Sequence, residues 1–393
     1  MEPKRRGRAG LRTVFHLTWI ALLSSGCTLT QRERWGEAAA ATQSELLAEV
    51  REISREEGLV AGRAFLEREF ARIDQSGGTF ERRVIATTQF AGLVYPDSLA
   101  SLPRSTRKRI AIVIVPGTQI GFGPPSQTRL TLAEAADEAD EMGFSTHFID
   151  TPPRGGVSEN AIEVAAAVKP VFRKVDHVLL ISLSKGAHDL IYYLQHQAQE
   201  LPLADRQKIR AVLSLVGTVQ GSVMADYFGN APRAVAAVTR ATLHLKGGAE
   251  EVAMLRTVAA TPWFPDCTDR MKRAFPNLTW VSIVALPDGD DGTISAKFWS
   301  PPIRRIIRNQ SPYFSPADGL VESGGAVLPE EVDFPEWVLY SYGSHSLPNG
   351  HYRDGTSVAP ETRDPDCELL NPESGGEMMS AYLRALPTSL LWQ

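Results

Sequence analysis

The sequence predicts an α/β fold in which a mostly parallel sheet carries helices on both faces. A β-branched run, Ile110–Val115, stops at Pro116 and Gly117, as a buried strand does when it enters a loop. After this run, segments typical of strands alternate with segments typical of helices as far as about residue 215. Strands separated by helices of this length form parallel sheets that are covered on both sides.

The first 26 residues have the order of an export signal. A basic stretch, Lys4–Arg12, precedes an apolar run, Val14–Leu23, and small residues follow as far as Cys27. The apolar run has about half of the roughly 20 residues that a membrane-spanning helix needs. We therefore predict a cleaved signal peptide rather than a transmembrane anchor.

Gly26 and Cys27 resemble the end of the lipobox of bacterial lipoproteins, in which a small residue precedes a cysteine that is lipidated and becomes the new N-terminus. The sequence departs from that motif at Ser24, where the family prefers leucine. The resemblance implies a lipid-anchored protein of the bacterial cell envelope that faces the periplasm or the cell surface. An ordinary secretory signal and a cytosolic N-terminal tail are the alternatives.

Charge is distributed unevenly between this signal and the rest of the chain. The formal net charge is −5, but the first 27 residues carry +4, from five basic residues and one acidic residue, which leaves −9 for the remainder. An acidic body has no general attraction for nucleic acid or anionic lipid. We therefore expect no nucleic-acid partner, and attachment to a membrane only through a lipid at Cys27. The sequence does not indicate an oligomeric state.

Besides Cys27, the chain contains two cysteines, Cys267 and Cys367. In an oxidising compartment these two could form one disulfide. Two free thiols are the alternative, because sequence spacing does not show whether the Cβ atoms meet.

Residues 27–105 form a predicted helical flank before the sheet. From Gln31 to about Ala71 the chain is rich in Ala, Glu, Leu and Arg, with apolar residues at helical spacing, which predicts one or two amphipathic helices. The apolar residues that set this spacing are Leu46, Leu47, Val50 and Ile53. The helices would serve either as a spacer behind the lipid or as a flank packed on the catalytic body.

The α/β domain is predicted to span residues 106–393, with a helical lid inserted at about 221–275. Beyond the first strand, we expect strands at 146–149, 177–182, 211–215, 280–285 and 337–342, and helices at 131–142, 159–172 and 187–196. The long interruption before the strand at 280–285 is mainly helical, and an insertion of that size over the edge of a sheet suits a lid.

The most informative segment joins the strand at 177–182 to the helix behind it. It reads Ser182-Leu-Ser184-Lys-Gly186, a small-x-Ser-x-small turn. A nucleophilic serine in such a turn has a strained backbone, so the residues two before and two after it must be small. Centring the turn on Ser182 would place the bulky Leu180 at a small position. Ser184 is therefore the predicted nucleophile.

With this turn, the chain from about Arg109 to Gly350 resembles the α/β-hydrolase superfamily, in particular bacterial lipases and esterases. The resemblance implies an α/β-hydrolase fold and an oxyanion loop at Val115-Pro-Gly-Thr-Gln119, after the first strand. Thr118 and Lys185 would then supply the backbone N–H groups of the oxyanion hole. The segment Leu215–Ser222 resembles the family's loop that leads into the lid.

A serine hydroxyl needs a histidine to accept its proton and an acid to orient that histidine. The segment Ser315–Val321 resembles the Asp-Gly-Leu-Val loop of lipases, which makes Asp318 the acid. His345 follows the last predicted strand and is the expected base.

Other residues near these positions are the alternatives. Asp290 and Asp291 compete for the role of acid, but the loop of Asp318 leads more directly to the final strand. His351 competes for the role of base but lies farther past that strand. His188 comes one helical turn after the nucleophile, and we expect it to pack or to face solvent.

Together these assignments predict a carboxylic ester hydrolase, an esterase or lipase, that acts on a small-molecule or lipid ester through an acyl-enzyme. It needs no cofactor, and no spacing of His, Cys or Glu suggests a metal site. The side chain of Lys185 could favour an acidic substrate, but a salt bridge with Asp189 or exposure to solvent is the preferred interpretation. The alternatives are a hydrolase of another acyl bond (thioester, amide or polyester) and a non-catalytic surface lipoprotein with a hydrolase fold.

Overall fold

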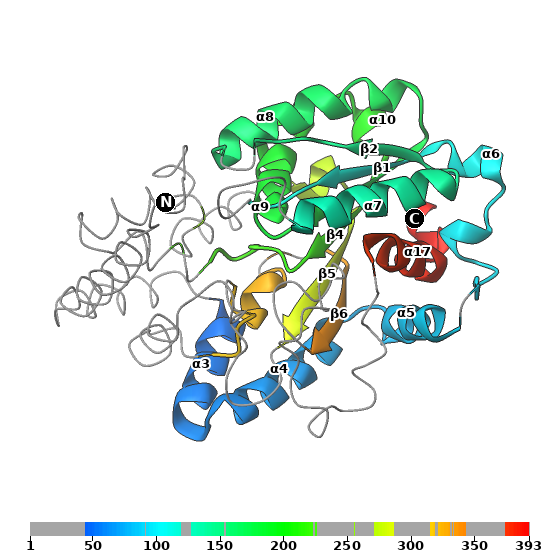
Figure 1. Cartoon of the computed structure of the whole chain (residues 1–393). Helices are drawn as coiled ribbons and strands as arrows, with labels where there is room; N and C mark the ends of the chain where they lie inside the picture. Colours follow the sequence, from blue (N-terminus) through cyan, green and yellow to red (C-terminus); the bar gives the residue numbers. More distant parts are fainter. Residues whose placement is uncertain are drawn as a thin grey trace, which may run out of the picture.

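The computed structural model describes residues 44–90, 92–118, 127–152, 155–222, 225, 255, 271–286, 315–318, 321–330, 332, 334–342 and 374–392. These residues form a central sheet with helices on both of its faces (Figure 1). In this part of the chain, none of the helices combines the length and the apolar character needed to cross a bilayer. Most of the predicted lid, 221–275, lies outside the described residues.

The sheet has six strands among the described residues, and every pair of neighbours runs parallel. They are β1 (Ile110–Val115), β2 (Ser145–Phe148), β3 (His177–Leu183), β4 (Ile209–Leu215), β5 (Thr279–Leu286) and β6 (Glu336–Tyr342). Their order is β2-β1-β3-β4-β5-β6, so the chain runs from β1 to the edge at β2, crosses back to β3 and continues outward to β6. The α/β-hydrolase core shares this strand order, and the predicted mostly parallel sheet with helices on both faces is confirmed. The predicted lid insertion stays a prediction.

The strands are continuous apolar runs because both faces of the sheet are covered. Alternate residues of β1 enter different hydrophobic clusters: Ile112 and Ile114 lie in one, and Val113 and Val115 lie in the other. The first cluster is covered by α5 (Thr79–Gln89), α7 (Gln127–Glu141) and α17 (Gly375–Ala385), and the second by α8 (Val157–Val168) and α9 (Lys185–Tyr192) (Figure 1).

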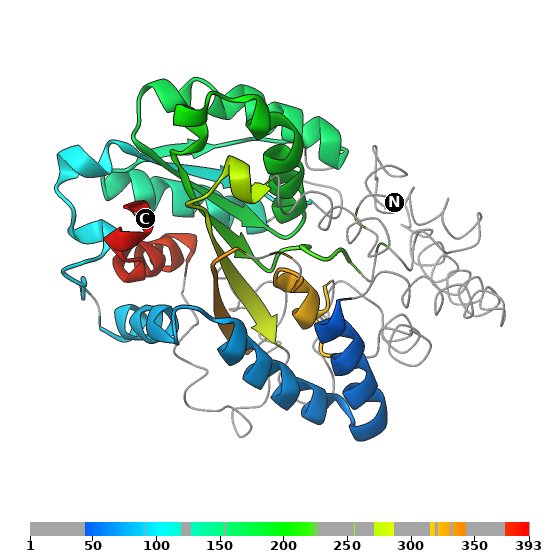
Figure 2. The ribbon, with the colours of Figure 1, turned by 180° about the vertical axis from the view of Figure 1, so that it is seen from behind.

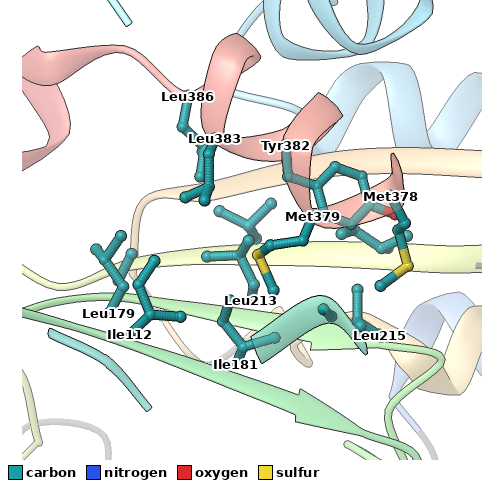
Figure 3. Packing of buried hydrophobic residues seen from close by; sticks show 14 of the residues in the cluster. Ile112, Leu179, Ile181, Leu213, Leu215, Met378, Met379, Tyr382, Leu383 and Leu386 are labelled. Carbon is teal, nitrogen blue, oxygen red and sulfur yellow. The ribbon is translucent and has the colours of Figure 1, made fainter. Parts of the chain in front are cut away.

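The helix α17 is an element that the sequence-based prediction lacks. The hydroxyl of Ser374 caps it by accepting a hydrogen bond from the backbone N–H of Glu377. The side chains of Met379 and Leu383 reach from α17 toward the sheet (Figure 3). A Cβ atom on Gly375 would lie 1.8 Å from a backbone oxygen of α7, so only glycine allows the two helices to approach this closely.

The N-terminal helices α3 (Glu45–Glu57) and α4 (Leu59–Ile73) pack on the far end of the sheet, near β5 and β6 (Figure 2). Gly58 joins them with φ at 96°, a conformation that favours glycine. The apolar residues of the two helices share one hydrophobic cluster with the sheet and the segment before β6: Leu46, Leu47, Val50, Phe65, Leu66, Phe70, Val284, Leu286, Val321, Ala326, Val327 and Val338. These helices are therefore a packed flank and not a spacer.

Candidate active site

Ser184 lies at the turn between β3 and α9, and its backbone is strained. Its φ of 52° and ψ of −121° place a non-glycine residue in a region that L residues rarely adopt. In the described part of the chain, Val216 is the other non-glycine residue with positive φ. Such conformations cost about 1–3 kcal/mol and persist where the surroundings enforce them, often at active sites.

Small residues on both sides of Ser184 allow the turn to form. A Cβ atom on Gly186 would lie 2.5 Å from the carbonyl oxygen of Val115 and 2.9 Å from that of Pro116, so the start of α9 crosses directly over the end of β1. Ser182 is fully buried in β3, and its hydroxyl donates to the carbonyl oxygen of Leu213 at 3.5 Å. The spacing of small residues in the sequence therefore reflects close backbone packing.

The loop that follows β1 lies against Ser184. A Cβ atom on Gly117 would lie 3.0 Å from the Cβ atom of Ser184 and 2.7 Å from the carbonyl oxygen of Leu183. Thr118 follows Gly117 and is half-buried, and Lys185 follows Ser184 as the first residue of α9. The structure thus brings together the two peptide segments that carry the candidate oxyanion-hole residues.

This contact lies where the strand order reverses. The chain turns from β1 outward to β2 and then resumes on the other side of β1 with β3. In open α/β sheets, ligands bind outside the carboxyl ends of the strands at such a point. The ends of β1 and β3 therefore form the expected place for a substrate.

The loop after β4 holds the backbone of Ser184. The N–H of Ser184 donates to the carbonyl oxygen of Leu215 at 2.9 Å, and the N–H of Thr218 donates to the carbonyl oxygen of Ser184 at 3.1 Å. A Cβ atom on Gly217 would lie 2.7 Å from the Cβ atom of Ala187, so this loop also contacts α9. The strained turn is thus fixed from the β4 side as well as from the β1 side.

His188 packs behind this turn and is fully buried. Its Nδ1 atom lies 3.0 Å from the carbonyl oxygen of Thr218, and because a carbonyl only accepts, Nδ1 carries the proton. Burial lowers the pKa of His188 to about 4, against the opposite effect of the Thr218 hydrogen bond, so the ring is neutral at pH 7. Of the two expectations for this residue, packing is correct.

The side chain of Lys185 turns away from solvent and forms the expected ion pair. Its Nζ atom donates to the two carboxylate oxygens of Asp189 at 2.9 and 3.0 Å, and both side chains are buried. Asn160 of α8 donates to the same carboxylate at 2.8 Å. The pKa of Asp189 is raised overall, because burial outweighs the opposite effects of the Lys185 charge and of the hydrogen bonds from Lys185 and Asn160. The cation is therefore satisfied within the fold.

Asp318, the candidate acid, is buried and lies between β5 and β6 in the chain. Its Oδ1 atom accepts a hydrogen bond from the N–H of Val321 at 2.9 Å, and its own N–H donates to the carbonyl oxygen of Val321 at 3.0 Å. The carboxylate is thus oriented by its own loop.

Gln220 connects this acid loop to the segment that holds Ser184. Its backbone N–H donates to the carbonyl oxygen of Gly325 at 2.9 Å, and its side-chain amide donates to those of Gly324 and Val327 at 3.3 and 3.1 Å. Thr218 and Gln220 lie in the Leu215–Ser222 segment that resembles the loop leading into a lid, but the sequence assigns neither of them a role. The signal available for them is the occurrence of polar residues among small and apolar ones directly after a buried strand.

Several predicted residues lie outside the described part of the chain: Cys27, Cys267, Asp290, Asp291, His345, His351 and Cys367. The choice of base, the choice between the acids and the disulfide therefore stay predictions. Among the described residues, no group of three or more His, Cys, Asp or Glu side chains is placed to hold a metal ion.

No protein-family model matches the chain, and no curated protein sequence matches it. Similar solved structures include the metagenomic carboxyl esterase MGS0156, with 19% identity and a TM-score of 0.45 over 70% of this chain and 76% of that one. The mature lipase BlEst2 of Bacillus licheniformis has 19% identity and a TM-score of 0.41, over 62% of this chain and 87% of that one. The phospholipase PlaB of Legionella pneumophila has 13% identity and a TM-score of 0.38, over 56% of this chain and 45% of that one. The assignment of the fold rests on the strand order.

Proposed function

We propose that the chain is a serine hydrolase that cleaves carboxylic esters, with Ser184 as its nucleophile. The observation that carries this proposal is the strained backbone of Ser184 at the carboxyl end of β3, with φ at 52° and ψ at −121°. A serine on such a strand-to-helix turn presents its hydroxyl at the top of the sheet. The close packing of Gly117 and Gly186 around the turn supports the same role, because it enforces the strain.

In the proposed reaction, His345 takes the proton of Ser184 while the hydroxyl oxygen attacks the ester carbonyl. Asp318 orients the imidazole and stabilises its positive charge. The backbone N–H groups of Thr118 and Lys185 hold the negatively charged oxygen of the tetrahedral intermediate. His345 then gives its proton to the leaving alcohol, and a water molecule repeats the sequence on the acyl-enzyme to release the acid.

Two features support the oxyanion assignment. The N–H groups in the first turn of a helix have no partner within that helix, and the helix dipole favours negative charge there; Lys185 is the first residue of α9. The side chain of Lys185 is held by Asp189, so its backbone is the group available at the turn. Gly117 lies against Ser184, and Thr118 is the next residue of the chain, which supports Thr118 as the second donor.

The test is hydrolysis of a panel of aryl esters of increasing acyl length, together with covalent labelling by a fluorophosphonate. We expect activity and labelling in the wild type and neither in Ser184→Ala. Ser145→Ala on the edge strand β2 serves as a serine control and should retain both. A wild type that hydrolyses none of the esters and takes no label would refute the proposal. Loss of labelling in Ser182→Ala but not in Ser184→Ala would identify Ser182 as the nucleophile instead.

We also propose that the protein is exported to the cell envelope and anchored by a lipid on Cys27. The support is the basic, apolar and small-residue order of the first 26 residues and the Gly26-Cys27 pair. Metabolic labelling with a palmitate analogue in a bacterial host should mark the wild type and not Cys27→Ala. An exported but unlabelled wild type would instead indicate an ordinary secretory signal.

A further inference from the structure

A buried ion pair joins the N-terminal flank to the acid loop. Arg51 of α3 and Glu322 both have side chains that are 3% exposed. The Nε atom of Arg51 donates to Oε1 of Glu322 at 2.9 Å, and Nη2 donates to Oε2. Two parallel hydrogen bonds between a guanidinium and a carboxylate fix the relative orientation of the two groups as well as their distance. The pair therefore sets the position of Glu322 relative to α3.

Glu322 in turn closes the loop that contains Asp318. Its Oε1 atom accepts a hydrogen bond from the hydroxyl of Ser315 at 2.6 Å, and its backbone pairs with Ala317 in an antiparallel bridge. The N–H of Ser323 donates to the carbonyl oxygen of the residue before Ala317 at 2.9 Å. Glu322 thus ties residues 321–323 to residues 315–318, which include Asp318, and Arg51 holds Glu322.

Both N-terminal helices press on the same loop. A Cβ atom on Gly62 of α4 would lie 3.3 Å from the side chain of Pro316. A Cβ atom on Gly324 would lie 3.2 Å from the side chain of Leu47 and 3.3 Å from that of Leu66. Figure 2 shows α3 beside the short helix η5 (Ser323–Ala326), which follows the loop. The loop therefore has little freedom to shift while the flank is in place.

Stability alone does not account for this ion pair. Two apolar side chains of similar volume would hold a buried contact about as well, because burying two charges costs most of what their attraction returns. An apolar contact would not fix an orientation. The bidentate pair does, at a loop whose carboxylate has to meet a histidine with hydrogen-bond geometry.

We propose that Arg51 is a positioning residue for the acid of the triad: through Glu322 it holds the loop 315–323 so that Asp318 can orient the catalytic histidine. This inference rests on the proposed hydrolase function, in which Asp318 is the acid. It assigns the N-terminal flank a part in catalysis, although the flank lies before the first strand of the sheet.

The test compares Arg51→Met and Arg51→Lys with the control Arg83→Met. Arg83 lies on α5 and binds Asp97 at 2.7 Å and the carbonyl oxygen of Ala385, far from the acid loop in sequence. For each protein, we would measure kcat and KM on the best aryl ester, the thermal midpoint, and hydrogen–deuterium exchange of the peptide that covers residues 315–327. The exchange measurement reports on the loop whether or not an ester is cleaved.

We expect Arg51→Met to lower kcat on the order of 10²-fold, the cost of displacing a catalytic group by about 1 Å, with little change in KM. The amides of Val321 and Ser323 should exchange faster. Arg51→Lys should recover part of kcat, because it keeps the charge but not the two parallel bonds. It also keeps the test valid if Arg51→Met does not fold. Arg83→Met should lower the thermal midpoint and leave kcat and loop exchange unchanged.

Three results would overturn the inference. Unchanged exchange in the loop of Arg51→Met would show that Arg51 does not hold it, whatever the activity. Faster exchange with wild-type kcat would show that the held position is not needed. An equal loss of kcat in Arg83→Met would reduce the effect to general stability. A wild type with neither activity nor fluorophosphonate labelling would instead refute the proposed hydrolase function, which is a separate outcome.

Discussion

Gly117 lies directly against Ser184, so that a Cβ atom on Gly117 would stand 3.0 Å from the Cβ atom of the serine. The loop after β1 and the turn after β3 are therefore packed with no space for a methyl group between them. The candidate oxyanion-hole residues, Thr118 and Lys185, each follow one member of this pair. Their relative position depends on glycine at residue 117.

Gly117→Ala should impair catalysis more than folding. The added Cβ would lie 2.7 Å from the carbonyl oxygen of Leu183, so the loop must move away from Ser184 and take the N–H of Thr118 with it. We expect kcat to fall on the order of 10²-fold or more, as when one oxyanion-hole donor is lost. Gly376→Ala is the matched control, because its Cβ would meet no atom closer than 3.5 Å. Equal kcat values for the two variants would contradict the oxyanion assignment.

Asp318→Asn should abolish most of the activity without opening its loop. An asparagine can still accept the N–H of Val321 through its side-chain oxygen, so the change removes charge and leaves the loop closed. We expect kcat to fall on the order of 10⁴-fold, the effect of the corresponding change in a well-studied serine protease triad. Asp290→Asn and Asp291→Asn should have small effects. A larger loss of kcat in either variant would assign the role of acid to Asp290 or Asp291 instead.

His188 should make the fold less stable in acid. Burial lowers its pKa from the ordinary value of 6.5 to about 4 in the folded state, so the unfolded chain binds more protons between these pH values. Its contribution to stability is therefore complete above pH 6.5 and is lost as pH falls, by up to about 3 kcal/mol at pH 4. Urea unfolding of the wild type and of His188→Gln at pH 7 and pH 4.5 measures this difference.

His188→Gln should show a weaker decline in stability on acidification, since its amide does not titrate and can still donate to Thr218. The exposed His196 provides the control, and His196→Gln should follow the wild type. If His188→Gln declined as steeply as the wild type, the buried imidazole would not be the group responsible.

Glu336 should make the fold less stable as the pH rises, which is the opposite of the effect of His188. Glu336 is the first residue of β6, and its carboxyl group is buried. Burial raises the pKa of this carboxyl to about 8. Hydrogen bonds from the hydroxyl of Ser282 at 2.5 Å and from the backbone N–H of Leu328 at 3.1 Å have the opposite, smaller effect. The folded state keeps the proton between pH 4.5 and 8 while the unfolded chain releases it. The contribution of Glu336 is complete below pH 4.5 and is lost as pH rises, by up to about 5 kcal/mol.

Glu336→Gln should remove this loss, because the amide oxygen can still accept from Ser282 and carries no charge. Its free energy of unfolding should exceed that of the wild type above pH 8 and approach it near pH 5. Chemical unfolding at pH 5, 7 and 9 measures the trend. A wild type whose stability rises from pH 5 to pH 9 relative to the variant would mean that the carboxyl is ionised in the fold.

The sheet could be predicted from the sequence because its strands are continuous apolar runs that are buried on both faces. Ile110–Val115 is both the clearest of these runs and β1 itself. The turn at Ser184 could be predicted because close packing leaves a local mark, a small residue on each side of the serine. In both cases the cause is tertiary packing, but the mark that it leaves in the sequence lies within about ten residues.

The contacts that hold the acid loop could not be predicted in this way. Arg51 and Glu322 are 271 positions apart, and neither has neighbours that distinguish it from a surface charge. The helix α17 could not be predicted for a similar reason, because its start depends on Gly375 fitting against a backbone oxygen of Thr131. Local pattern carries no information about such a partner, which exists only after the chain has folded.

The contact between α3 and the acid loop also bears on how the protein can be shortened. The sheet, Ser184 and the loop that contains Gly117 all follow Arg109, and a truncation designed from the strands alone would start there. Such a fragment would contain Ser184 and Asp318 but would leave Glu322 without its partner Arg51. The smallest fragment that keeps this contact therefore begins no later than Ser44, the residue that caps α3.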